Sequence, residues 1–516
     1  MTIRIGVDVG GTNTDAVLMD GMEVVSKIKT ATSEDVTSGI TTALRHILEV
    51  SGTATDAVSG VMIGTTHFTN AVVERRHLEK TAAVRLGLPA TAALPPMVDW
   101  PEDLRDVLGG QYYLCHGGYE FDGREISKFD ADEIKAAAAD IRAKGIRAIA
   151  VSSVFSPVNT SMEDLAAAIL ESEVPGATVT KSSDIGRIGL LERENAAILN
   201  ACLRVLAKRT VAAFRRAIKE LDISAPLYLT QNDGTLMSSD FAEQNPVLTF
   251  ASGPTNSMRG AAFLSGLKDA MVVDIGGTTA DVGALTRGFP REASVAVEIG
   301  GVRTNFRMPD VYSFGLGGGS HVLTEPLKIG PQSVGYRLTQ QALIFGGKVL
   351  TASDIAVAAG VVKFGDASKV AHLPVELTTA AMNLIQDMCE IAVDRMKTSA
   401  APVPVIMVGG GSVLISRPIA GASDMVKPNH FEAANAVGAA IAQISGEVDR
   451  VYSLTSVTRE QALDLAKAEA SKKAVEAGAD PSTVEIVDVE DVPLSYLPGN
   501  ATRIRVKAVG DLTLAN

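Results

Sequence analysis

Cysteine is scarce in this sequence, and so are the histidine spacings typical of metal sites. The three cysteines, Cys115, Cys202 and Cys389, lie far apart and form no CxxC pair. This argues against both a disulfide framework and a thiolate zinc site. The seven histidines contain no HxH or HExxH motif, so the sequence indicates no histidine-ligated metal either.

Basic residues are scarce relative to acidic ones, and long apolar runs are missing. The 47 Lys and Arg residues stand against 60 Asp and Glu, which gives a net charge of −13. A chain of this sign repels phosphate backbones, so we expect no nucleic-acid partner. Charges and glycines interrupt every apolar stretch, and the chain opens on a strand-like segment instead of an export signal. We therefore expect a soluble cytoplasmic protein without a membrane partner.

Several familiar catalytic motifs are absent as well. The sequence has no GxxxxGK[ST] phosphate loop, no G-x-S-x-G nucleophile elbow and no cysteine with an evident histidine partner. Residues 315–320 nearly spell GxGxxG, but they end in Ser320 and lack a clear strand-to-helix setting. A dinucleotide-binding fold is therefore not supported.

An internal repeat is the most informative feature that the sequence does contain. Residues 7–15 read VDVGGTNTD, and residues 273–281 read VDIGGTTAD. Each copy lies between two apolar runs, which predicts two hairpins of strand, glycine turn and strand. Because 516 residues are too many for one ordinary core, the duplication predicts two large related domains.

The repeated glycine turns are interpreted as phosphate cradles. A Gly-Gly turn lets backbone N–H groups approach an anion without a Cβ in the way, and nearby hydroxyls add donors. Asp8 and Asp274 end the preceding strands, where a carboxylate can hold Mg²⁺ while the metal bridges phosphate oxygens. A single copy could equally be a plain hairpin turn, but two copies that keep the whole pattern favour binding. The predicted cradle residues are Gly10, Gly11, Thr12, Asn13, Thr14, Gly276, Gly277, Thr278 and Thr279.

Two further segments are rich in small residues. Gly409, Gly410 and Gly411 follow the apolar run 405–408, where glycine permits close approach of a base or a ribose to the backbone. Residues 432–440 form a small-residue helix that either lets two helices cross closely between domains or simply packs in the core.

Strand and helix patterns alternate along the chain, which predicts an α/β class. Strands are expected at 82–86, 146–151, 227–230, 271–275 and 403–408, and helices at 130–143 and 194–221. The polar stretch 180–189 suggests the main boundary. A charged helix at 459–477 and strands at 485–489 and 503–509 predict a small α+β appendage. The expected domains are residues 1–185, 186–450 and 451–516.

In these motifs the sequence resembles the sugar kinase, Hsp70 and actin superfamily, and within it the A-type subunits of the hydantoinase/oxoprolinase family. The resemblance implies two duplicated actin-like, ribonuclease H-like domains around a nucleotide cleft. It implies a first phosphate motif at 8–15, a second at 274–281 and an adenosine motif at 405–412, with connecting helices at 194–203 and 433–440. The family-specific segments are residues 63–75, 250–254, 273–281 and 315–320, and the last adds Gly317 and Gly318 to the expected nucleotide contacts.

The resemblance also implies a reaction, the ATP-dependent opening of a cyclic amide such as a hydantoin, an oxoproline or a lactam. In this family ATP phosphorylates the carbonyl oxygen, and water then attacks the activated carbon. Asp8 and Asp274 would hold Mg²⁺ and, with Thr12 and Thr278, form the predicted catalytic set. No B-type half is present, so a B-type partner subunit is expected. A ketone carboxylase subunit, a small-metabolite kinase, an ATP-switched scaffold and a homo-oligomer all remain open.

A polar loop between two apolar runs is the candidate substrate segment. It contains Thr65, Thr66, His67 and Asn70. Polar loops of this kind often carry substrate or phosphate contacts. The alternative is an ordinary helix start whose hydroxyls satisfy backbone groups.

Overall fold

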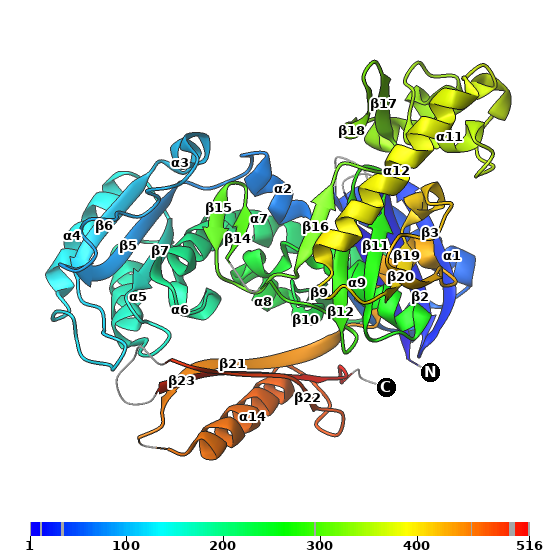
Figure 1. Cartoon of the computed structure of the whole chain (residues 1–516). Helices are drawn as coiled ribbons and strands as arrows, with labels where there is room; N and C mark the ends of the chain where they lie inside the picture. The colour runs from blue at the N-terminus through cyan, green and yellow to red at the C-terminus, as the bar shows by residue number, and fades with distance from the viewer. Residues whose placement is uncertain are drawn as a thin grey trace.

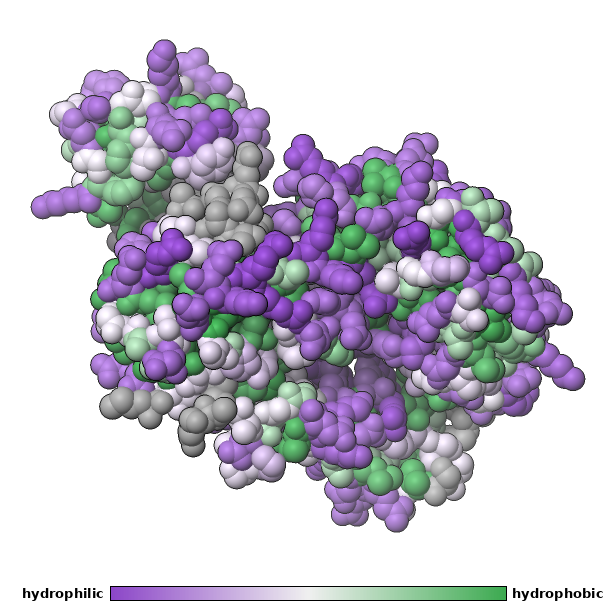
Figure 2. All heavy atoms as spheres, turned by 180° about the vertical axis from the view of Figure 1, so that it is seen from behind, coloured by the Kyte–Doolittle hydropathy of each residue, from purple (hydrophilic) through white to green (hydrophobic). Residues whose placement is uncertain are grey.

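The computed structural model describes residues 2–10, 13–31, 36–293, 296–455, 457–494 and 501–513. Strands and helices alternate, and the strands form two large sheets, one four-stranded sheet and two separate hairpins (Figure 1). This confirms the predicted α/β class. No helix in these ranges is long and apolar enough to cross a membrane. On the face shown in Figure 2, hydrophilic residues dominate and apolar ones are scattered.

The first large sheet has nine strands in the order β22-β23-β21-β10-β9-β4-β1-β2-β3. The parallel pairs in it include β1 with β4, β4 with β9 and β10 with β21. Its strands are β1 (Ile3–Val9), β2 (Asn13–Asp20), β3 (Glu23–Ala31), β4 (Val58–Thr65), β9 (Leu227–Thr230), β10 (Thr235–Ser238), β21 (Gln443–Ser453), β22 (Glu485–Pro493) and β23 (Ala501–Gly510).

This sheet does not follow the domain boundaries expected at residues 185 and 450. Strands β9 and β10 lie within the range expected for the second domain, and β21 crosses its end at residue 450. All three nevertheless belong to the sheet that contains β1. Likewise, β22 and β23 belong to the same sheet, to which β21 joins them. Parallel pairing joins strands that are far apart in the chain, so local sequence patterns do not reveal it.

The second large sheet is built around the second copy of the repeat. It has the path β13-β12-β11-β19-β20, with β16 paired to β12, and a third sheet has the order β6-β5-β7-β8. The hairpins β14–β15 and β17–β18 stand apart from both. The bounds are β5 (Thr81–Leu88), β6 (Gln111–His116), β7 (Ala148–Ser153), β8 (Thr178–Lys181), β11 (Ala270–Ile275), β12 (Ala280–Thr286), β13 (Phe289–Pro290), β14 (Val297–Ile299), β15 (Val302–Thr304), β16 (Val311–Phe314), β17 (Ser320–Thr324), β18 (Leu327–Ser333), β19 (Val403–Val408) and β20 (Ala422–Val426).

Helices cover the sheets and connect them (Figure 1). Two short 3₁₀ turns, η6 (Gly410–Leu414) and η7 (Phe431–Ala433), lie between strand β19 and helix α13 in the chain. The helices are α1 (Val36–Ser51), α2 (His67–Val73), α3 (Glu102–Leu108), α4 (Ala131–Ala143), α5 (Ser161–Glu173), α6 (Ser182–Ile185), α7 (Leu190–Glu220), α8 (Ser239–Gln244), α9 (Ser252–Ser265), α10 (Leu338–Gln341), α11 (Ala352–Ala358), α12 (Val375–Met396), α13 (Ala434–Ala440) and α14 (Arg459–Glu476).

Both copies of the repeat fold as the predicted antiparallel hairpins. In β1–β2 the residue opposite Asp8 is Asp15, and in β11–β12 the residue opposite Asp274 is Asp281. A parallel strand lies on the other side of each first strand, β4 beside β1 and β19 beside β11. The two copies therefore present the same local architecture, which confirms the duplicated actin-like arrangement.

The long helix α7 links two of the hydrophobic cores. Its first half packs with the third sheet in a cluster that includes Leu199 and Leu203. Its second half packs with α1 and the first sheet in a cluster that includes Val211 and Phe214. A single helix therefore contributes to both hydrophobic cores. It begins at Leu190, four residues before the predicted start at residue 194.

The C-terminal strands are held against the rest of the molecule by buried charges. The Lys507 Nζ lies 2.7 Å from Asp233 Oδ2, and Arg307 pairs with Glu447 on β21 and with Glu292, 3.3 Å away. Burial alone would raise the pKa of Asp233, but Lys507 and Arg307 outweigh it and hold that pKa below its usual range. The Arg307–Glu447 pair connects the β13–β16 segment to β21, and the Lys507–Asp233 pair connects the β9–β10 turn to β23.

Helices α9 and α13 cross almost without a gap. A Cβ added at Gly438 of α13 would lie 1.8 Å from the Asn256 carbonyl oxygen of α9, and one at Gly260 would lie 1.8 Å from the Ala434 carbonyl oxygen. On its other side α13 meets β1, where a Cβ at Gly6 would lie 2.1 Å from the Ala436 carbonyl oxygen. Helix α9 in turn packs on β11 and β19. The small-residue helix thus joins the two large sheets, as the close-crossing interpretation predicts.

Candidate functional site

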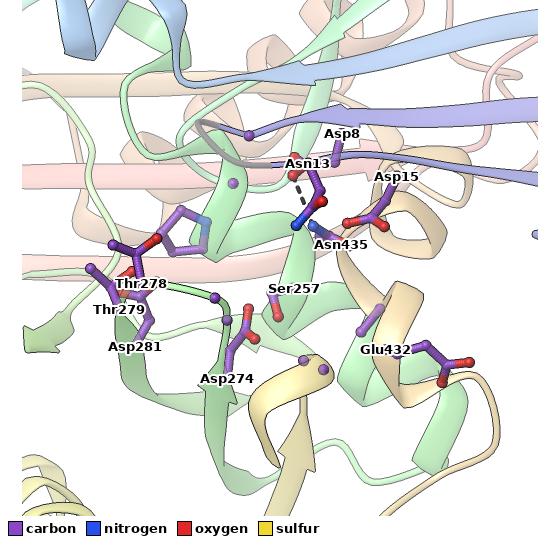
Figure 3. A pocket seen from close by; sticks show the side chains of 18 of the residues that line it. Asp8, Asn13, Asp15, Ser257, Asp274, Thr278, Thr279, Asp281, Glu432 and Asn435 are labelled. Atoms are coloured by element: carbon purple, nitrogen blue, oxygen red, sulfur yellow. Dashed lines mark hydrogen bonds between the residues drawn. The ribbon is translucent and has the colours of Figure 1, made fainter. Parts of the chain in front are cut away.

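The two copies of the repeat line one cavity of about 220 Å³. Figure 3 shows the residues of β1 and β2 on one side of it and those of β11 and β12 on the other. The first copy contributes Asp8, Gly10, Asn13 and Asp15, and the second contributes Asp274, Gly276, Gly277, Thr278, Thr279 and Asp281. The twin turns therefore face a common space.

The two glycine turns close in the same way. The Gly10 N–H donates to the Asn13 carbonyl oxygen at 3.1 Å, and the Gly276 N–H donates to the Thr279 carbonyl oxygen at 2.9 Å. The same backbone hydrogen bond therefore closes both hairpins. Gly11 and Thr12, two predicted contacts, lie outside the described residues.

Each central aspartate has a helix residue beside it. The Asn435 Nδ2 of α13 donates to Asp8 Oδ2 at 2.8 Å, and the Ser257 hydroxyl of α9 faces Asp274 (Figure 3). The other Asp8 oxygen, Oδ1, is buried and has no hydrogen-bond partner among the described residues. The crossing helices α9 and α13 therefore position the carboxylates of both repeats.

The cavity is strongly acidic. Asp8, Asp15, Asp274, Asp281 and Glu432 line it. Burial raises the pKa of Asp8 to about 7, and the nearby charges of Asp15 and Asp274 add to the rise. Burial likewise raises the pKa of Asp281 to about 6 and shifts those of Asp15 and Asp274 upward. Burying these carboxylates close together without a bound metal ion destabilises the folded state, which is typical of a site built for a ligand.

We expect the Asp8→Asn variant to be more stable than the wild type, by a margin that grows between about pH 4 and pH 7. At lower pH the Asp8 carboxyl is protonated in both the folded and the unfolded chain, so the substitution changes little. At higher pH the wild type must ionise a buried carboxyl, whereas asparagine stays neutral. One pKa unit corresponds to about 1.4 kcal/mol, so the variant should gain more than about 1 kcal/mol at pH 8.

Calorimetric unfolding of the ligand-free protein from pH 4.5 to pH 8 measures this difference. The exposed Asp56→Asn variant is the matched control, and it should track the wild type at every pH. If the stability difference between Asp8→Asn and the wild type stays constant with pH, the pKa of Asp8 is not raised by folding.

The aspartates fit a divalent cation that is bound together with phosphate. Among the described residues, no three His, Cys, Asp or Glu side chains are grouped so that they could hold a metal ion by themselves. Mg²⁺ commonly takes one or two carboxylates and fills its remaining positions with phosphate and water oxygens. The unpartnered Asp8 oxygen and the raised pKa values suit such a cation.

Only part of the third glycine cluster reaches the cavity. Gly409 and Gly410 line it. Gly409 has a φ of +78°, and a Cβ there would lie 2.1 Å from Asp274 Oδ1. Gly411 is buried, and a Cβ there would lie 2.6 Å from the Gly276 carbonyl oxygen. Glycine is therefore required for η6 to approach the second turn.

The structure places Gly317 and Gly318 behind the second turn, outside the lining of the cavity. The Gly318 N–H donates to the Gly276 carbonyl oxygen at 3.1 Å, and a Cβ at Gly317 would lie 2.4 Å from the Gly277 carbonyl carbon. These glycines support the turn from the rear because only a chain without side chains can pack so closely there.

The candidate substrate loop is divided between two roles. Thr66 lines the cavity together with Gly253 and Pro254 of α9. Thr65 is buried, and its hydroxyl accepts a bond from the His67 N–H at 3.2 Å, as the helix-start alternative predicts. His67 and Asn70 lie outside the lining, and Asn70 is exposed. Burial lowers the pKa of His67, which favours its neutral form.

Comparison with known proteins agrees with this architecture. A family model described as hydantoinase/oxoprolinase N-terminal region matches residues 4–174, and one described as hydantoinase/oxoprolinase matches residues 193–403. Together these ranges include both copies of the repeat and most of the residues that line the cavity.

Individual relatives include enzyme subunits of two kinds. The chain is 27% identical to the caprolactamase subunit alpha of Pseudomonas jessenii over 69% of its own length and 54% of the relative's. It is 24% identical to the acetophenone carboxylase gamma subunit of Aromatoleum aromaticum, over 69% and 53% of the two chains. The chain thus spans about half the length of the curated relatives that it matches.

The solved structure of the ATP-dependent caprolactamase from Pseudomonas jessenii has the same fold. It superposes with a TM-score of 0.79 at 19% identity, over 99% of this chain and 88% of that one. The architecture around the cavity therefore matches that of a structurally characterised relative.

Proposed function

Because the chain belongs to the hydantoinase/oxoprolinase family, we propose that it is the nucleotide-handling subunit of an ATP-dependent enzyme that opens a cyclic amide. One observation carries this proposal: the turns and aspartates of both repeats meet in a single cavity. Two facing cradles of backbone N–H groups suit the phosphate chain of one nucleotide. The caprolactamase relative, whose name states a lactam substrate, supports the choice of a cyclic amide.

The residues of the cavity have distinct tasks in this proposal. The turns that begin at Gly10 and Gly276 hold the phosphates, and the hydroxyls of Thr278 and Thr279 line the second turn. Asp8 and Asp274 hold Mg²⁺ directly or through water, and the metal neutralises charge on the phosphate oxygens. Catalysis of phosphoryl transfer by such a site consists mainly of alignment and charge stabilisation.

The chemical purpose of the transfer is to activate an unreactive carbonyl group. An amide carbon is a poor electrophile because nitrogen shares its electron pair with the carbonyl. When the carbonyl oxygen takes the terminal phosphoryl group, the bond to ADP breaks and this protection is lost. Water can then add to the carbon, and the ring carbon–nitrogen bond breaks to leave an amine and an acyl phosphate. A second water hydrolyses the acyl phosphate to the carboxylate and releases phosphate. Thr66, at the edge of the cavity, is the proposed contact to the substrate.

A partner subunit is part of the proposal. Both curated relatives described above are named as subunits of larger enzymes. We therefore propose that a B-type subunit completes the ring-opening site, while this chain binds and positions the nucleotide in the cytoplasm.

A ketone carboxylase subunit is the second candidate. The acetophenone carboxylase relative favours it, because its name assigns carboxylation of a ketone to an enzyme whose gamma subunit is 24% identical to this chain. The two functions share the phosphate cavity and differ in the group that takes the phosphoryl. The cavity alone is compatible with both.

Substrate-dependent ATP consumption tests the proposal. The chain would be assayed with a co-encoded B-type subunit, Mg²⁺ and a panel of lactams, hydantoins and ketones, with and without bicarbonate. The proposal expects ADP and phosphate to form in step with an opened amide. ATP consumption that requires both a ketone and bicarbonate would establish the carboxylase instead. A stable phosphorylated product would identify a kinase.

A further inference from the structure

We propose that Lys29 binds the terminal phosphate of the nucleotide, which places the reactive phosphate at the first repeat. This inference rests on the proposed nucleotide function and adds a residue to its phosphate site. It assigns a role to a residue that the glycine motifs do not include.

Lys29 is the only Lys or Arg among the described residues that line the cavity. It lies on β3, directly opposite Asp15 of β2, and its Nζ is 3.0 Å from Asp15 Oδ1. The Lys29 side chain is 45% exposed, so solvent can reach the ammonium while Asp15 holds it. A lysine ammonium has three N–H donors, which leaves donors free for a phosphate oxygen while the contact to Asp15 persists.

Lys29 lines the same cavity as Asp8 and Asp274. Its ammonium therefore shares the space in which the proposed metal and the phosphates would lie.

Among the residues that the structure describes, the second repeat contributes no such cation to the cavity. There the residue opposite Asp281 is Ser313 of β16, and the Ser313 hydroxyl donates to the Asp281 carboxylate. The pairs Asp15–Lys29 and Asp281–Ser313 occupy the same position in the two hairpins. The duplicated cavity is therefore electrostatically unsymmetrical, with its only ammonium in the first half.

This asymmetry favours one place in the cavity for the terminal phosphate. A terminal phosphate carries the most negative charge of the chain, so it is expected beside Lys29. At the other side, Gly409 and Gly410 of the second half line the cavity, and a Cβ at Gly410 would meet no atom within 4 Å. That open backbone suits a ribose or a base. Thr66 follows β4, the parallel neighbour of β1, so the proposed substrate contact lies in the same half as Lys29.

Comparing two nucleotides tests the inference. The dissociation constants of Mg²⁺-bound β,γ-imido ATP and of Mg²⁺-bound ADP would be measured by titration calorimetry for the wild type and for Lys29→Met. We expect the triphosphate to bind about tenfold more weakly or worse in the variant, as for one lost charge-assisted hydrogen bond. ADP should stay within about threefold of the wild type, since a more distant charge is screened.

Lys27→Met is the matched control. Lys27 lies two positions earlier on β3, pairs with Glu432 and does not line the cavity, so its loss should change the ratio of the two affinities little. Lys29→Arg keeps the charge and should restore most of the preference for the triphosphate.

The outcomes separate this inference from the proposed function. If the wild type binds neither nucleotide, the proposed function fails. If the wild type binds both, and Lys29→Met weakens them equally or weakens neither, the proposed function stands and the role assigned to Lys29 is wrong.

Discussion

Replacing Asp274 by alanine is expected to lower Mg²⁺-ATP turnover by at least about 100-fold, equivalent to roughly 3 kcal/mol of lost transition-state stabilisation. The carboxylate is half-buried, lines the cavity and is one of the two groups proposed to hold the metal against the phosphates. Asp8→Ala should cause a loss of similar size, because the two repeats contribute equivalent carboxylates. Steady-state release of phosphate with the partner subunit and substrate present measures both effects.

The fold of these variants should remain largely intact. Burial raises the pKa of both aspartates, so removing them relieves an unfavourable charge in the ligand-free protein. The melting temperature at pH 8 should therefore be no lower than that of the wild type, and Asp56→Ala should leave turnover unchanged. Unchanged turnover in both Asp8→Ala and Asp274→Ala would rule out the metal role.

Replacing Gly438 by alanine is expected to destabilise the protein by at least about 2 kcal/mol, the usual cost of overpacking a tight contact. The new Cβ would lie 1.8 Å from the Asn256 carbonyl oxygen, and that oxygen belongs to a helix backbone that cannot turn aside. Helices α9 and α13 must separate to make room. Denaturant unfolding of the variant and of the wild type measures the cost.

Gly253→Ala is the matched control for this substitution. It adds the same methyl group to α9 at a position where the nearest atom is Thr66 Cγ2, 3.5 Å away, which is an ordinary contact. Its free energy of unfolding should stay within about 1 kcal/mol of the wild type. If Gly438→Ala and Gly253→Ala cost the same, the crossing is looser than the structure shows.

The crossing also explains why Gly438→Ala should impair catalysis in the fraction that folds. Asn435 and Ser257, which lie beside Asp8 and Asp274, belong to the two helices that must separate. A shift of the helices is therefore expected to change the spacing of the carboxylates that are proposed to hold the metal. Small displacements of this kind strongly reduce catalysis that depends on alignment.

Local patterns in the sequence were enough to predict individual elements of the fold. The expected strands at 227–230 and 403–408 match β9 and β19 residue for residue, and the charged helix at 459–477 exceeds α14 by one residue. These segments could be predicted because their pattern of apolar and polar residues is strong and their ends are clear. The pairing of β4 with β9 and of β10 with β21 was not predicted, because it depends on contacts across more than 160 residues.

The candidate site, too, could be predicted only in part from the sequence. The repeat identified the hairpins that share the cavity, since its glycines and aspartates form a contiguous pattern that survived duplication. Asn435 and Ser257 gave no signal, because single polar residues in small-residue helices are common and their partners are distant in sequence. Lys29 could have been found from the register of β3 against β2, had the length of the connecting turn been known.

The structure of this chain with Mg²⁺ and β,γ-imido ATP tests the central claim most directly. The account predicts that the phosphates lie between the turns at Gly10 and Gly276, with contacts from both repeats and the metal beside Asp8 and Asp274. A nucleotide whose phosphates touch only one of the two turns, or lie outside this cavity, would contradict it.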